Sequence, residues 1–129
     1  REVGPLEPWE VVEARVAVSL APDQPQVVAD LAWLLATSAD GSVRNPREAR
    51  VTAERASTLG RDDDPRLLDV LAAAQAASGD FDDARRTARR AVAAARAAGD
   101  EKLATAAEAR ARSYASRVAF RERSPAAPN

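Results

Sequence analysis

The residues best able to do chemistry in this chain are carboxylates and arginines, because histidine and cysteine are both absent from its 129 residues. Without histidine, a serine or threonine lacks the commonest general base, and zinc lacks its commonest ligand. Without cysteine, disulfides and thiolate metal sites are excluded. Pairs of Asp and Glu could still transfer protons, but no pair lies on a segment expected to form a pocket. We therefore expect no enzyme activity, no cofactor and no metal site.

Three consecutive aspartates, Asp62, Asp63 and Asp64, could suggest a divalent cation. The run lacks the glycine and the distal glutamate of a calcium loop. Asp64 stands directly before Pro65, and proline is favoured at the first position of a helix. An aspartate at that place can accept hydrogen bonds from the free N–H groups of the first turn. Helix capping is therefore the favoured interpretation.

A second charged group is a basic stripe on one expected helix, formed by Arg85, Arg86, Arg89, Arg90 and Arg96. Such a stripe could bind nucleic acid or anionic lipid. However, no aromatic residue interleaves with it, three aspartates lie at the start of the same helix, and the formal net charge of the chain is −1. A solvated helix face with local charge pairs is favoured, and we expect no nucleic-acid partner.

Prolines, glycines and aspartates divide the remaining chain into six segments rich in alanine, the strongest helix former. No segment has the alternation of a strand, so the pattern predicts an all-α fold. The expected helices cover residues 9–20, 25–37, 46–59, 65–78, 81–98 and 101–121. Asn45 and Asp64 are expected N-caps, and Gly60 is expected to close the third helix in the left-handed conformation. No apolar run approaches the ~20 residues of a membrane span.

The helices carry a repeated pattern of large and small residues. The second and fourth helices share one spacing, seen in Val28, Leu31, Ala32 and Leu35 and again in Leu68, Leu71, Ala72 and Gln75. The third and fifth share an alanine spacing, seen in Ala49, Ala53 and Ala56 and again in Ala84, Ala88 and Ala91. Short side chains let two helices approach closely. We expect Leu31, Leu35, Leu68 and Leu71 to be deeply buried.

These features resemble the tetratricopeptide (TPR) repeat family. The segment of residues 79–84 is similar to the turn inside a TPR unit, and residues 65–98 have the 34-residue length of one unit. Residues 31–37 and 114–122 are similar to C-terminal TPR regions of larger bacterial proteins. The resemblance implies an α-solenoid of antiparallel hairpins, with about two units, one preceding helix and one capping helix. A plain alanine-rich bundle is the alternative.

The resemblance also suggests how the chain is organised. Residues 9–122 are the expected TPR-like domain, with residues 1–8 as an N-terminal extension and residues 123–129 as a flexible tail. The domain is expected to begin in the middle of a unit, and Trp9 is expected to shield the face that the missing helix would cover. We interpret the chain as a fragment of a larger bacterial protein, which could carry a membrane anchor. A cytoplasmic location is favoured; a periplasmic or extracellular one fits a parent with a signal or anchor.

The function implied by the resemblance is a protein–protein interaction scaffold that binds a peptide or protein segment on a concave surface. The expected contact residues are Gln26, Ala29, Trp33, Thr37, Arg66, Asp69 and Ala73, with Ala77 on the same line. Trp33 could anchor the partner, or it could pack against the preceding or missing helix. Two other functions stay open: a structural or oligomerisation appendage of a larger enzyme, such as a membrane glycosyltransferase or a kinase, and nucleic-acid binding through the arginines of the fifth helix.

Overall fold

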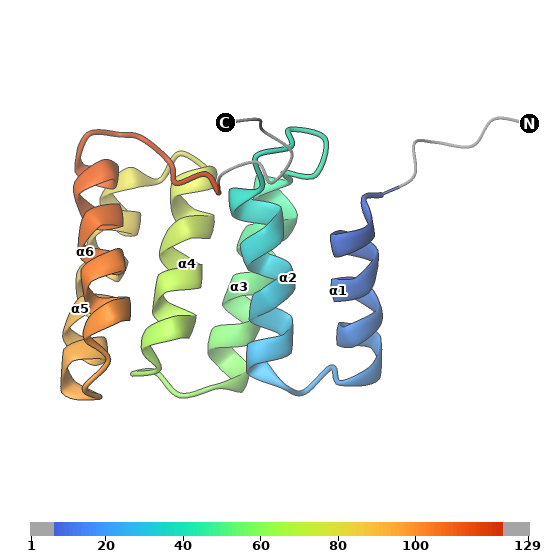
Figure 1. Cartoon of the computed structure of the whole chain (residues 1–129), viewed down its shortest axis with the longest axis horizontal. Helices are drawn as coiled ribbons and strands as arrows, with labels where there is room; N and C mark the ends of the chain where they lie inside the picture. The colour runs from blue at the N-terminus through green and yellow to red at the C-terminus, as the bar shows by residue number, and fades with distance from the viewer. Residues whose placement is uncertain (1–6, 123–129) are drawn as a thin grey trace, which may run out of the picture.

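The computed structural model describes residues 7–122, which form six α-helices (Figure 1). The helices are α1 (Trp9–Leu20), α2 (Pro25–Thr37), α3 (Pro46–Leu59), α4 (Pro65–Ala77), α5 (Phe81–Ala97) and α6 (Glu101–Ala115). The described residues contain no strand, so the predicted all-α class with six helices is confirmed. Of the predicted N-terminal extension, residues 1–6 lie outside the described part of the chain, as does the whole predicted tail, residues 123–129.

Prolines and polar side chains start the helices at the predicted places. Proline is the first residue of α2, α3 and α4. The side chain of Asn45 accepts from the backbone N–H of Glu48 at 3.1 Å, and Asp64 accepts from the N–H groups of Arg66 and Leu67. Both predicted N-caps are therefore confirmed. Asp63, the neighbour of the Asp64 cap, pairs with Arg61 at 3.2 Å.

Three helices end with the same backbone reversal. The second residue after each helix takes the left-handed conformation: Gly79 after α4 (φ 85°), Gly99 after α5 (φ 78°) and Arg117 after α6 (φ 62°). The next backbone N–H then donates back across the last turn, at 2.9 Å for α4, 2.8 Å for α5 and 2.9 Å for α6. This hydrogen bond satisfies a carbonyl that would otherwise lack a partner.

The predicted end of the sixth helix at residue 121 is wrong, because α6 ends at Ala115. Arg117 occupies a position that glycine holds in the other two reversals, so the usual sign of a helix end is missing from the sequence. The chain continues without helical structure through residues 116–122, a segment that we call the strap. In Figure 1 the strap runs from the end of α6 past α4 toward α2.

The prediction for Gly60 is also wrong in its conformation. Gly60 follows α3 as predicted, but its φ of −100° and ψ of −161° are extended rather than left-handed. Glycine is needed there for space, since a Cβ atom would collide with Cδ1 of Leu67 in α4. The turn between α3 and α4 therefore packs directly on the first turn of α4.

The helices stack in chain order. α2 packs on α3, and α4 packs on α5; these two hairpins are joined by contacts of α2 and α3 with α4. α1 packs on α2 at one end, and α6 packs on α5 and α4 at the other. α2, α4 and α6 thus lie next to one another in that order (Figure 1). This arrangement is consistent with a helical repeat.

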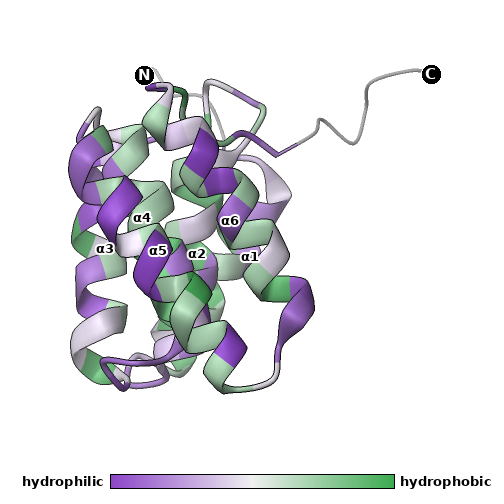
Figure 2. Ribbon diagram, turned by 90° about the vertical axis from the view of Figure 1, so that its left-hand side faces the viewer, coloured by the Kyte–Doolittle hydropathy of each residue, from purple (hydrophilic) through white to green (hydrophobic). Residues whose placement is uncertain are grey.

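Alanines line the contacts between helices, as the repeated spacing predicts. All six alanines of the α3 and α5 pattern are buried. In Figure 2 hydrophilic and hydrophobic residues alternate along the helices, as expected for helices that each bury one side. None of the helices within residues 7–122 combines the length and apolarity that crossing a membrane requires.

Three of the four leucines expected in the core are buried: Leu31, Leu35 and Leu68. Leu71 is only half-buried, so its predicted deep burial is wrong. Leu67, one turn earlier in α4, is 2% exposed because the turn at Gly60 covers it. Leu71 lies beyond that turn, at the edge of the main core cluster.

Candidate interaction surface

The strap lies against α2 through three contacts near the end of that helix. The backbone N–H of Glu122 donates to the carbonyl of Thr37 at 2.7 Å. The indole N–H of Trp33 donates to the Glu122 carboxylate at 2.8 Å. The Phe120 and Trp33 rings have centroids 5.6 Å apart and planes tilted by 39°. An aromatic ring, a carboxylate and a backbone amide of the strap are therefore each matched by a group of α2.

Arg110 of α6 connects this contact to α4. Its guanidinium donates to both carboxylate oxygens of Asp69, at 2.9 and 2.7 Å, and the two side chains are only 13% and 6% exposed. The Cζ atom of Arg110 also lies 5.2 Å from the centroid of Trp33 and 5.0 Å from that of Phe120. A bidentate pair holds the guanidinium plane in a fixed orientation. Arg110 therefore acts as a rigid cation beside two aromatic rings.

Burial shapes the electrostatics beneath the strap. Burial raises the pKa of the Asp69 carboxyl above its ordinary value, and the hydrogen bonds from Arg110 oppose that rise. Burial also raises the pKa of Tyr114, and the nearby Asp69 charge adds to the effect. The Tyr114 hydroxyl is buried without a hydrogen-bond partner among the described residues. Tyr114 consequently stays neutral at any ordinary pH and serves as a packing group.

The structure separates the predicted contact residues into two groups. Gln26 and Arg66 lie at the far end of α2 and α4 from the strap, where Arg66 donates to Gln26 at 3.0 Å and to Asp30 at 2.8 Å. The remaining polar contact there joins Gln26 to Asp64 at 3.0 Å. Four of the predicted residues are instead buried: Ala29, Thr37, Asp69 and Ala73.

Trp33 is half-buried, and one of its contacts, the strap, belongs to neither interpretation of its role. It packs against the core cluster that contains Ala29 and Ala73 and against Phe120 of the strap. From the sequence, the packing partners considered for Trp33 are the preceding helix and a missing helix. The ring that stacks on Trp33 is that of Phe120, which lies 87 residues further along the chain.

Sequence reasoning missed Arg110, Phe120 and Glu122. Phe120 was assigned to a helix, which would place it on a helix face rather than on α2. One feature of the sequence points to the start of the strap: Ser116-Arg117-Val118 occupies the same position after α6 that Ser78-Gly79-Asp80 occupies after α4. The resemblance between these two helix ends is concealed by the replacement of glycine with arginine.

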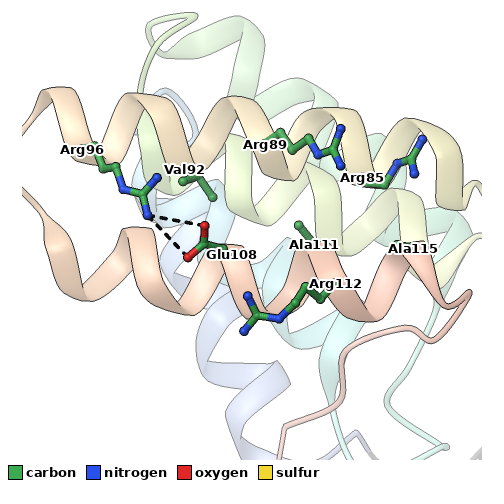
Figure 3. A pocket seen from close by; sticks show the side chains of 8 residues that line it. All are labelled: Arg85, Arg89, Val92, Arg96, Glu108, Ala111, Arg112 and Ala115. Carbon is green, nitrogen blue, oxygen red and sulfur yellow. Dashed lines mark hydrogen bonds and ion pairs between the residues drawn. The ribbon is translucent and has the colours of Figure 1, made fainter.

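A second region is a hollow of about 400 Å³ between α5 and α6 (Figure 3). Its lining comprises Arg85, Arg89, Val92, Arg96, Glu108, Ala111, Arg112 and Ala115. Arg96 pairs with Glu108 at 3.4 Å, whereas Arg85, Arg89 and Arg112 have no hydrogen-bond or ion-pair partner within residues 7–122. In Figure 3 Arg85 and Arg89 extend from α5 and Arg112 from α6, and their guanidinium groups do not converge on one point.

The rest of the basic stripe is turned to solvent. Arg86 pairs with Asp83 on the same helix, and Arg90 is exposed beside Asp62 and Asp63. This placement agrees with the favoured interpretation of the stripe as a solvated helix face with local charge pairs.

Comparison of the chain with protein-family models, curated proteins and solved structures finds no match. The resemblance to TPR proteins therefore stays a prediction, and functional inference depends on the geometry of the chain itself.

Proposed function

We propose that this chain is a TPR-like interaction module that binds a peptide or protein segment on the surface formed by α2, α4 and α6. The observation that supports this function is the strap itself, a nonhelical peptide segment held by Trp33, Arg110 and the carbonyl of Thr37. The same groups are suited to a segment of another protein, because none of them depends on the strap being part of the chain.

The chemistry of these groups favours a peptide over a small molecule. The Thr37 carbonyl belongs to the last turn of α2, where helix carbonyls have no partner inside the helix. It accepts a backbone N–H, which every non-proline residue can supply. Trp33 provides a large ring with a polar N–H, the type of side chain that dominates binding energy in protein interfaces. Backbone recognition beside an aromatic anchor is a common mode of peptide binding.

Photo-crosslinking in the organism that makes the protein tests this function. A photoreactive amino acid at Gln26, at the uncovered end of the surface, should capture a polypeptide, whereas the same group at Arg90 on the outer side of α5 should not. Adding Trp33→Ala should abolish the capture, and adding Trp9→Ala, which changes the other tryptophan, should not. Equal capture at Gln26 and Arg90, or capture that ignores Trp33, would reject the proposal.

One observation favours the structural appendage as a second candidate. Three large apolar side chains of α1 are exposed: Trp9 by 71%, Val16 by 51% and Leu20 by 80%. Their spacing of seven and four residues places them on one face of the helix. α3 and α5 each pack between two helices, whereas within residues 7–122 α1 packs on one side only, on α2, with Arg15 reaching Glu48 of α3. The element that fits this face is one further amphipathic helix, lying on α1 as α2 lies on α3.

The crosslinking experiment separates the two candidates. Capture from Val16 without capture from Gln26 would favour the appendage. Capture from Gln26 that depends on Trp33 would favour the interaction module.

A further inference from the structure

We infer that the segment recognised on the α2–α4–α6 surface carries an aromatic residue followed two positions later by a carboxylate, and that it competes with the strap for Trp33 and Arg110. This inference rests on the proposed function and specifies its ligand. The strap supplies the pattern: Phe120 is the aromatic residue and Glu122 is the acid.

The aromatic position is defined by two groups that are already in place. Phe120 lies against both the Trp33 ring and the Arg110 guanidinium. Asp69 fixes Arg110 through two hydrogen bonds, so an incoming aromatic ring meets a cation that needs no further ordering. An aliphatic side chain could fill the same space but would lose the attraction of a cation for a ring face. The geometry therefore favours an aromatic residue.

The acidic position follows from the end of α2. Glu122 accepts from the Trp33 N–H while its own backbone N–H donates to Thr37. A carboxylate near the carbonyl end of a helix is normally repelled by the helix dipole. Arg44 brings a positive charge to the same end of α2, because its guanidinium donates to the Ser38 and Ala39 carbonyls at 2.7 and 3.3 Å. The intervening Arg121 is exposed and hydrogen-bonds only to Phe120 within the described residues, so the middle position is free to vary.

The strap is held loosely enough to be replaced. Arg117, Val118, Arg121 and Glu122 are all exposed, so Phe120 and its neighbour Ala119 are the most buried of these strap residues. The strap nevertheless follows α6 directly, and a tethered segment competes at an effective concentration of about millimolar. An external segment must therefore bind more tightly than the strap, or the strap must first be weakened.

The inference is tested with the full chain carrying Trp9→Phe, which leaves Trp33 as the sole tryptophan and its fluorescence as the signal. Phe120→Ala removes the anchor of the strap and frees the aromatic position. Three peptides are compared: one with the sequence of residues 116–122, one with alanine in place of its phenylalanine, and one with glutamine in place of its glutamate.

The Phe120→Ala chain should bind the first peptide at least about tenfold more tightly than either altered peptide. It should also bind that peptide at least about tenfold more tightly than the chain with an intact strap does, because the competitor has been removed. The Glu122→Gln chain keeps the aromatic residue of the strap. Its affinity for the first peptide should therefore lie between that of the Phe120→Ala chain and that of the chain with an intact strap. Circular dichroism confirms that each variant is folded.

Equal affinity for all three peptides, or no binding to either folded variant, would overturn the inference. The experiments distinguish failure of the proposed function from failure of this inference about its ligand. If crosslinking from Gln26 depends on Trp33 but the first peptide does not compete with it, the module binds a segment of different chemistry. If the peptide binds as expected and no polypeptide is captured, the recognition pattern stands and the cellular role does not.

Discussion

Arg110 in α6 and Arg89 in α5 carry the same charge but lie in opposite environments. Arg110 is enclosed between Asp69, Trp33 and Phe120. Arg89 is exposed at the rim of the α5–α6 hollow and has no ion-pair partner within the described chain. The arginine-rich stripe is the conspicuous feature of the sequence, yet an arginine outside that stripe organises the surface. Pairing and burial, rather than the local number of charges, decide which arginine structures the protein.

The largest expected effect tests this contrast directly. Asp69→Asn should reduce the free energy of unfolding by about 3–5 kcal/mol, because the Arg110 charge is left without compensation in a nearly buried position. Arg89→Gln should change it by less than about 0.5 kcal/mol, since an exposed side chain without a partner loses little. Urea unfolding of both variants measures the difference. Equal small effects would show that Arg110 is as solvated as Arg89.

The apolar side of α4 offers a second contrast, between Leu67 and Leu71. Leu67→Ala should destabilise the protein by about 2–4 kcal/mol, because it opens a cavity in the core. Leu71→Ala should cost clearly less, since Leu71 already contacts solvent. The same urea series provides the comparison. A larger loss for Leu71 than for Leu67 would contradict the observed packing of α4.

A third arginine, Arg117, reverses the backbone at the start of the strap. Arg117→Gly relieves a left-handed backbone that costs about 1–2 kcal/mol for a residue with a Cβ atom. It also removes the guanidinium from the Phe81 ring, 5.3 Å away, which costs about 0.5–1 kcal/mol at an exposed site. The net result should be a gain in stability of about 0–1.5 kcal/mol.

The matched control is Gly99→Ala, at the equivalent position after α5. A Cβ atom there meets nothing within 4 Å, so the change isolates backbone strain and should destabilise the protein by about 1 kcal/mol. Thermal unfolding of both variants tests the expected opposite signs. Destabilisation by both would show that the contact with Phe81 outweighs the strain.

The smallest expected effect is the pH dependence of the stabilisation that an ion pair outside this surface contributes. Arg15 hydrogen-bonds Glu48 at 2.6 Å and lowers the pKa of that carboxyl below its usual value of 4.5. A lowered pKa in the folded state means that the stabilisation is present above pH 4.5 and is lost as the pH falls further. The pair should contribute less than about 1 kcal/mol, because each side chain is about one-third exposed.

Glu48→Gln should therefore be less stable than the original chain at pH 7, and the difference should shrink below pH 4.5. Unfolding curves between pH 7 and pH 3 measure this difference. A difference that grows on acidification would refute the assignment to Glu48.

Local signals in the sequence predicted most of the helices. Proline and aspartate mark the starts, Gly79 and Gly99 mark two ends, and alanine spacing marks the buried seams. The strap could not be predicted in this way, because Arg117 reverses the chain without glycine and Phe120 meets Trp33 across a large separation in sequence. Burial of Asp69 and partial exposure of Leu71 likewise depend on tertiary contacts with Arg110 and the Gly60 turn, which the spacing within α4 does not encode.

The position of the strap is tested most directly by nuclear Overhauser effects in the full chain. The Trp33 resonances are identified by their disappearance in Trp33→Phe. The structure predicts cross-peaks between the Trp33 and Phe120 rings, together with slow exchange of the Glu122 amide that donates to Thr37. Random-coil shifts for residues 118–122, with no contact between the two rings, would contradict it.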